Sequence, residues 1–210
     1  FMKHRPVFQE GQLWLARTLI ERDNYDGARR LLDQLADSPG TYNDVRRDVA
    51  VAQAHLAIQE GEFAVAAQAL ANAVDKSNNK EERARLSFIK AQLHQQLGQS
   101  GEAFVAYEQV VRLKPSYGME FAARLNMAQN AYLSGQGTAV EAIANLKKLL
   151  NDGKNEPYQD QIQFLLESFL SSCVIVVALN AIIPVTHVIS FFLRGREFFQ
   201  NVQTKKNYHQ

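Results

Sequence analysis

Five histidines are the side chains in this sequence best suited to acid–base catalysis or metal binding. They lie far apart, and none occurs in an H-E-x-x-H arrangement, in which two histidines one helical turn apart bind zinc. His55 and His94 belong to neighbouring copies of a repeated unit described below, but they occupy different positions in it. We therefore predict no metal site and no bound cofactor. The five residues are His4, His55, His94, His187 and His209.

The single cysteine and the paired carboxylates give no better candidate for catalysis. Cys173 lies in an apolar stretch with no neighbouring group that would activate its thiol. Glu60 and Glu62 flank a turn, where solvation and the charge of helix ends account for them. Gly135-Gln136-Gly137 is an isolated loop fragment that matches neither phosphate-binding glycine motif. These observations predict that the protein is not an enzyme.

The charges are balanced and dispersed along the chain. There are 23 Lys and Arg residues against 22 Asp and Glu residues. Basic pairs such as Arg29-Arg30 and Lys147-Lys148 do not form one stripe, which is typical of solvated helix faces. We predict no nucleic-acid partner.

Two short helices joined by a tight turn form the unit around which the sequence is organised. It is clearest in residues 83–115. Gly98 ends the first helix of this unit, because glycine readily adopts the left-handed backbone conformation of a helix stop. Ala103 and Tyr107 lie one turn apart on an amphipathic second helix. Pro115 stops that helix because it has no N–H to continue the hydrogen-bond ladder.

The same unit occurs four times, with a period of 37 to 39 residues. Closely packed helices need a small residue where their backbones approach, and a bulky residue one turn later to fill the groove. Four columns of residues follow this rule. The first helix supplies Ala16, Ala54, Ala91 and Ala128; the turn supplies Asp23, Gly61, Gly98 and Gly135; the second helix supplies Ala28, Ala66, Ala103 and Ala142, with Leu32, Leu70, Tyr107 and Leu146 as bulky partners.

This pattern resembles the tetratricopeptide repeat family. The resemblance is carried by the small–x–x–large first helix, the turn Gly61-Glu62-Phe63 and the alanine of the second helix, and it covers roughly residues 10–151. The usual period of the family is about 34 residues, so we expect longer helices or linkers here. Ser100 departs from the aromatic residue expected in the turn, and the last copy has extra residues around Gly135–Thr138.

A narrower resemblance concerns the segments after the repeats. The Ala/Gln-rich repeats, followed by residues 151–155 and 158–162, are similar to tetratricopeptide lipoproteins of type IX secretion and gliding motility in Bacteroidetes. The resemblance implies a bacterial protein of the cell envelope with its repeats in the periplasm. A cytoplasmic protein is the alternative.

We predict an all-α fold, a right-handed α-solenoid of about four and a half tetratricopeptide-like helix-turn-helix repeats followed by an apolar C-terminal helix. The solenoid is predicted over residues 10–164, with its first helix at Gln12–Glu21. Residues 1–9 are expected to be the end of a preceding repeat or a linker, so the chain would be a fragment of a longer protein. Residues 165–194 are predicted as an apolar helical segment and residues 195–210 as a basic polar tail.

The apolar segment is open to three interpretations. Residues 169–193 contain no Asp, Glu, Lys or Arg, and a bilayer span needs about 20 apolar residues. Arg194 and Arg196 follow as a basic flank would, while Pro184 predicts a kink. The segment is a transmembrane helix, a buried cap on the solenoid, or a non-native terminus produced by reading through in another frame. Comparing all frames of the coding DNA distinguishes the third.

The inner wall of a solenoid of helix pairs is formed mainly by the first helices. The residue after each first-helix alanine, and the residue one further turn along, are predicted to face this groove. The alternative for Ile20 and Ile58 is that they complete the core. Trp14 is predicted to pack in the core or between repeats. The eight groove residues are Arg17, Ile20, His55, Ile58, Gln92, Gln95, Gln129 and Tyr132.

These features predict a non-catalytic scaffold that binds protein. A polar, Gln-rich groove suits an extended peptide or a helix of a partner. It lacks the set of Lys and Asn residues with which some tetratricopeptide grooves clamp a C-terminal carboxylate. The resemblance adds a secretion or motility complex as the setting. The alternative is a structural spacer within a larger tetratricopeptide protein, with a tail that is non-native or anchors it to a membrane.

Overall fold

Helices account for nearly all of the structure. The computed structural model describes the backbone of residues 7–180 and the side chains of residues 7–171, and no strand occurs within that part of the chain. The elements are α1 (Val7–Glu21), α2 (Tyr25–Asp37), α3 (Asn43–Gln59), α4 (Phe63–Lys76), α5 (Lys80–Gln96), α6 (Ser100–Leu113), α7 (Tyr117–Leu133), α8 (Ala139–Leu150), the 3-10 segment η1 (Gly153–Tyr158) and α9 (Gln159–Asn180).

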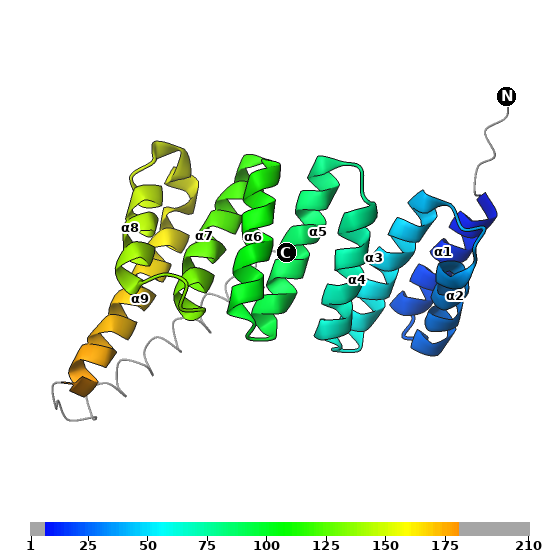
Figure 1. Ribbon diagram of the computed structural model, residues 1–210, viewed down its shortest axis with the longest axis horizontal. Helices are drawn as coiled ribbons and strands as arrows, with labels where there is room; N and C mark the ends of the chain where they lie inside the picture. The colour runs from blue at the N-terminus through cyan, green and yellow to red at the C-terminus, as the bar shows by residue number, and fades with distance from the viewer. Residues whose placement is uncertain (1–6, 181–210) are drawn as a thin grey trace, which may run out of the picture. The chain divides into compact units, whose positions relative to one another are not determined.

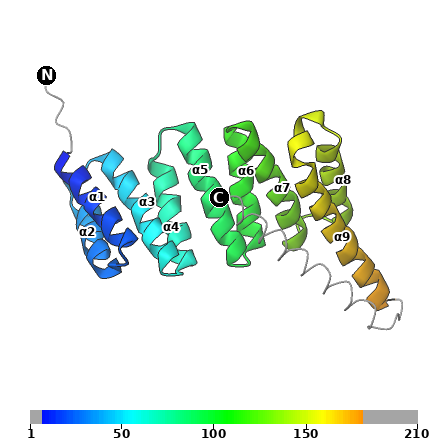
Figure 2. The same cartoon turned by 180° about the vertical axis from the view of Figure 1, so that it is seen from behind.

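The chain divides into two compact units, Phe1–Leu146 and Lys147–Gln210. In the first unit, α1 and α2, α3 and α4, and α5 and α6 lie side by side as pairs (Figures 1 and 2). Each pair contacts the next, through α2 and α3, through α4 and α5, and through α6 and α7. The first helices α1 and α3 also contact each other, as do α5 and α7. This order of contacts confirms the predicted all-α solenoid of helix pairs.

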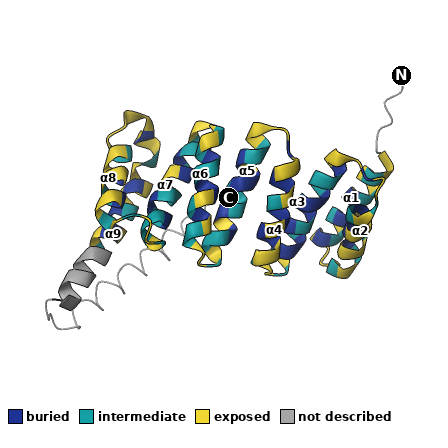
Figure 3. Cartoon of the chain, viewed as in Figure 1, coloured by how far each residue is buried: buried dark blue, intermediate teal, exposed yellow. Residues whose placement is uncertain are grey.

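The repeated small and bulky residues are those at which the helices pack. Every member of the three packing columns is buried, with at most 7% of its surface exposed. Ala16, Ala66 and Tyr107 have no exposed surface at all. Figure 3 shows buried segments along each of these helices, alternating with exposed ones. The columns therefore recur because each pair repeats the same close approach of two backbones.

The core of the first unit is a row of clusters. One cluster joins α1, α2 and α3 and includes Leu32 and Val49. The next joins α3, α4 and α5, and a third joins α5, α6 and α7 around Tyr107 and Val110. Each cluster thus contains one helix pair and the first helix of the following pair. A pair buries its apolar residues only when its neighbour is present.

All four residues of the turn column adopt the left-handed conformation that a helix stop needs. After Gly98 the turn closes with two backbone hydrogen bonds, from Gly98 N–H to the Gln95 carbonyl at 3.1 Å and from Gln99 N–H to the His94 carbonyl at 2.9 Å. The fourth turn is wider, because Gly137 N–H bonds back to the Ala131 carbonyl at 3.0 Å. The φ values are 57° at Asp23, 78° at Gly61, 70° at Gly98 and 72° at Gly135.

The helix bounds agree with the sequence except at the start of α1. The helices α3, α5 and α7 each have 17 residues, which confirms the expectation that the long period reflects longer helices. The helix α1 begins at Val7 rather than at Gln12. Its first turn carries Val7 and Phe8, which are exposed, so the pattern of buried positions did not reach back to the true start.

The second unit contains the end of α8, η1 and α9. The carboxylate of Asp152 caps η1 by accepting a hydrogen bond from Lys154 N–H at 3.1 Å. The Asn155 side chain is buried and donates to the Leu149 carbonyl at 2.8 Å. The helix α9 begins at Gln159, directly after η1.

The candidate membrane segment 169–193 is only partly described. Its first residues belong to α9, and residues 181–193 lie outside the described part of the chain. Among the helices that are described, none combines the length and the apolar character needed to cross a bilayer.

Candidate functional site

The eight predicted groove residues fall into two groups. The residue that follows each first-helix alanine stays at the surface: Gln92 is exposed, and Arg17, His55 and Gln129 are partly exposed. These four side chains occupy equivalent positions on α1, α3, α5 and α7. They are the part of the predicted groove that remains open to a partner.

Of the other four residues, three contact the interior and the fourth, Tyr132, is partly buried. Ile20 is 2% exposed and belongs to the core cluster of α1, α2 and α3, and Ile58 packs against the next cluster. The Gln95 side chain accepts a hydrogen bond from the Tyr107 hydroxyl at 3.0 Å, so it points toward α6. The alternative that Ile20 and Ile58 complete the core is therefore the correct one.

A column that the sequence interpretation missed continues the open surface. Residues four positions after the first group share its side of the helix, and all four are exposed. The signal was available in the sequence as the i, i+4 spacing. We call these two columns together the first-helix face. It consists of Arg17, His55, Gln92 and Gln129, with Glu21, Gln59, Gln96 and Leu133 one turn further on.

His55 connects two helices across the first-helix face. Its Nε2 lies 3.9 Å from the Glu21 Oε1 on α1 and 3.2 Å from the Gln59 Nε2 on α3. Side chains from successive first helices thus come within reach of one another. Four of its eight side chains are amides, each of which can donate and accept hydrogen bonds. Such groups can pair with the N–H and C=O groups of a bound polypeptide.

Trp14 was predicted to pack in the core or between repeats, but no other helix covers it in the described structure. The indole is 66% exposed on α1. The Arg17 guanidinium lies over its ring, 5.3 Å from the ring centre, in a cation–π arrangement. The sequence favours burial for a large aromatic residue, but the side of α1 that carries Trp14 has no neighbouring helix in the described structure.

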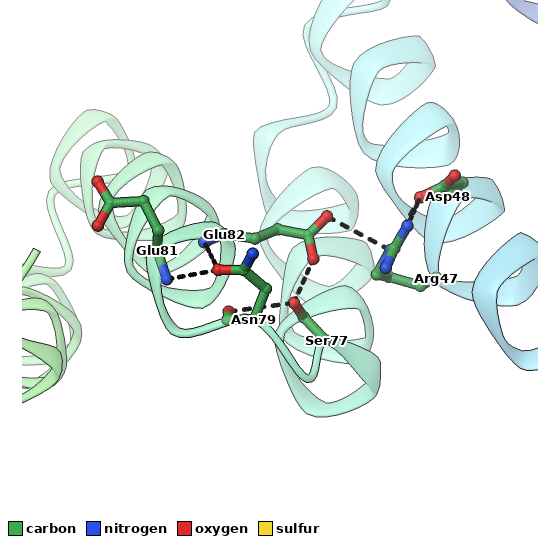
Figure 4. Close-up of polar contacts among 6 residues, drawn as sticks. All are labelled: Arg47, Asp48, Ser77, Asn79, Glu81 and Glu82. Carbon is green, nitrogen blue, oxygen red and sulfur yellow. Dashed lines mark hydrogen bonds and ion pairs between the residues drawn. The ribbon is translucent and has the colours of Figure 1, made fainter.

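A half-buried ionic cluster near the start of α5 is structural (Figure 4). Arg47 on α3 contacts Asp48 at 2.8 Å and Glu82 on α5 at 3.4 Å, and Ser77 donates to the Glu82 carboxylate. Burial alone would lower the pKa of the Arg47 guanidinium, but the hydrogen bond with Asp48 and the nearby carboxylates raise it on balance. The Asn79 side chain caps α5. These contacts join successive repeats, and every charged group in the cluster has a partner.

In the described part of the chain, no three His, Cys, Asp or Glu side chains lie close enough together to hold a metal ion. His94 is engaged with Gln99, at 2.8 Å from its Nδ1 to the Gln99 Oε1, and His55 with Glu21 and Gln59. His4, His187 and His209 and the Cys173 side chain lie outside the described residues.

The comparison with protein families matches this architecture. Residues 51–118 match the family model described as tetratricopeptide repeat, from within α3 to the start of α7. Over these residues the chain is similar to tetratricopeptide repeats. Comparisons with curated proteins and with solved structures gave no match. Tetratricopeptide repeats typically serve as non-catalytic modules that bind other proteins, through the extended surface built by their stacked units.

Proposed function

We propose that the first-helix face binds an extended segment or a helix of a protein partner, and that the protein is a non-catalytic scaffold. The observation that supports this is the repetition of exposed or partly exposed polar side chains at one position of all four first helices. Gln92 and Gln129 offer amide groups at equivalent places on successive repeats. A polypeptide lying across the repeats meets hydrogen-bonding groups at regular intervals.

Site-specific photo-cross-linking tests this proposal. A photoreactive amino acid is placed at Gln92 or Gln129 in the full chain, expressed in its native cells, with Gln68 as the control. Gln68 is exposed on the second helix α4, away from the proposed face. We expect one protein to be cross-linked from both face positions and not from Gln68.

Variants measure what the face contributes to affinity for that cross-linked protein. Each hydrogen bond contributes about 0.5–1.5 kcal/mol, so Gln92→Ala and Gln129→Ala should each weaken binding about threefold to tenfold. Gln68→Ala should leave it unchanged. Equal cross-linking from Gln68, or unchanged affinity in both face variants, would contradict the proposal.

The spacer function is the second candidate. Its support is the exposed apolar side of α1, which carries Phe8 and Trp14. A segment whose first helix has an exposed apolar side fits within a longer array of repeats, in which another helix would cover that side. A spacer would give no cross-links from Gln92 or Gln129 above the level of Gln68.

The cell-envelope setting rests on the resemblance of the repeats and of residues 151–162 to tetratricopeptide lipoproteins of secretion and motility. We propose it as the location of the scaffold, with residues 169–193 as a candidate anchor. Fractionation of native cells tests it. Recovery of the protein with the envelope supports the location, and recovery in the cytoplasm contradicts it.

A further inference from the structure

One side of α1 carries large apolar side chains that are open to solvent. Val7 is 64% exposed, Phe8 78%, Trp14 66% and Leu15 52%. Gly11 and Thr18 lie on the same side and are also exposed. Spacings of three, four and seven residues place all of them along one helix face. We call this surface the α1 outer face, and it consists of Val7, Phe8, Gly11, Trp14, Leu15 and Thr18.

Four of these six positions are buried in α3, and two of them are buried in α5 and in α7. In α3 the residues equivalent to Val7, Gly11, Trp14 and Thr18 are each at most 3% exposed. They share a core cluster with residues of α2. In α5 and α7 the positions equivalent to Gly11 and Thr18 are likewise buried. The equivalents are Val45, Val49, Ala52 and Leu56 in α3, Leu86 and Leu93 in α5, and Ala123 and Asn130 in α7.

The preceding second helix is what covers these positions. The contacts of α2 with α3, of α4 with α5 and of α6 with α7 are the interfaces at which one repeat meets the next. The helix that ends an array of repeats normally has a polar outer side, which keeps the array soluble. The α1 outer face is apolar instead, so α1 has the character of an internal first helix.

We propose that the α1 outer face receives the second helix of a further helix pair that precedes α1 in the same polypeptide. Three interfaces of the same kind occur within the chain, and a helix on the α1 outer face would continue their series. The incoming helix presents small and apolar side chains, as α4 does in the cluster that it shares with Leu86 and Leu93 of α5. Gly11 leaves room for its backbone, since no atom lies within 4 Å of a Cβ built there. Trp14 takes the place of Ala52, so the incoming helix meets it with small side chains.

Trp14 is the only tryptophan in the sequence, so its fluorescence reports directly on this face. The first sample is the 210-residue chain, and the second carries a copy of residues 80–116 joined in front of Arg5. This junction gives Val7 the spacing that Met119 has after α6. We expect acrylamide to quench Trp14 efficiently in the first sample. In the second, a monomer, the quenching constant should fall severalfold and the emission should shift to shorter wavelength.

Two substitutions of one glycine provide the matched control. Gly11→Ala keeps the position small, like Ala123 in α7, and should leave Trp14 shielded in the extended protein. Gly11→Glu places a charge in the middle of the interface and should restore quenching to the level of the original chain. A Cβ added at Gly11 meets no neighbouring atom in the chain itself.

Three results would overturn the proposal. Acrylamide could quench Trp14 as efficiently as in the original chain, although circular dichroism shows the added pair to be helical. The added pair could stay unfolded next to an intact α1, in which case the face does not stabilise the pair assigned to it. Trp14 could also be shielded already in the 210-residue chain, in proportion to protein concentration, and a second copy would then be the occupant.

Discussion

Tyr107 shows how a single residue holds a helix pair together. The side chain has no exposed surface, and its ring meets Phe88 edge-on with 5.3 Å between the ring centres. Its hydroxyl donates to the Gln95 side chain at 3.0 Å. Burial raises the pKa of Tyr107 from 10.0 to about 12, because the phenolate would lose its hydration.

This pKa shift predicts how stability changes at high pH. The folded state holds the Tyr107 proton more tightly than the unfolded state, so the stabilisation is complete below pH 10 and is lost as the pH rises through about 12. Tyr107→Phe should lower the free energy of unfolding by about 1 kcal/mol at neutral pH, because it removes the hydrogen bond. The stability of this variant should then fall less steeply between pH 10 and 12 than that of the original protein. Denaturant unfolding at a series of pH values measures both. Parallel declines in the two proteins would show that Tyr107 is not the group responsible.

The alanine columns predict a large difference between two neighbouring positions on α4. Ala66 has no exposed surface, and Ala64 is exposed two residues earlier. Ala66→Leu should destabilise the protein by about 1–3 kcal/mol, since the added methyl groups must enter a filled interface. Ala64→Leu should change stability by about 0.5 kcal/mol or less. Chemical denaturation compares them, and similar free energies of unfolding would argue against close packing at this column.

The turn glycines act at the scale of the helix pair. At Gly61, φ is 78° and no atom lies within 4 Å of an added Cβ, so the constraint is in the backbone and not in the space around it. Gly61→Ala should therefore cost about 1–2 kcal/mol. Gly11→Ala, in the middle of α1, should stabilise by about 0.5–1 kcal/mol. Thermal unfolding should show a lower melting temperature for Gly61→Ala and a higher one for Gly11→Ala. A stabilising Gly61→Ala would contradict the assigned turn.

The helix pairs could be predicted from the sequence because each kind of position selects its own residue types. Close approaches carry alanine, grooves carry a bulky residue, and left-handed turns mostly carry glycine. Asp23 could be placed in the turn column only through its spacing from Gly61 and Gly98, since aspartate rarely adopts positive φ. The start of α1 could not be predicted. Its first turn is exposed in the structure, and an exposed apolar residue such as Phe8 does not follow the pattern of a buried stripe.

At the scale of the whole chain, periodicity shows which residues are equivalent but not which way they point. An α-helix turns about 100° per residue, so three residues after Arg17 the helix has turned about 60° to one side, and four residues after it about 40° to the other. The first direction leads to buried Ile20 and the second to exposed Glu21. The position of the second helix decides between them. That position comes from packing in three dimensions, and so the sequence predicted only half of the face.

The exposure of Trp14 depends on the surroundings of α1 and not on α1 itself. Its equivalent Ala52 is buried in a cluster that α3 shares with the preceding pair, α1 and α2. A local sequence pattern does not report whether such a neighbour is present.

The binding role of the first-helix face is the central claim, and hydrogen exchange on the full chain, with and without the cross-linked partner, tests it most directly. We predict that the C-terminal halves of α1, α3, α5 and α7 gain protection on binding, while α2, α4 and α6 exchange as before. Protection confined to the second helices, or to residues 147–171, would contradict it.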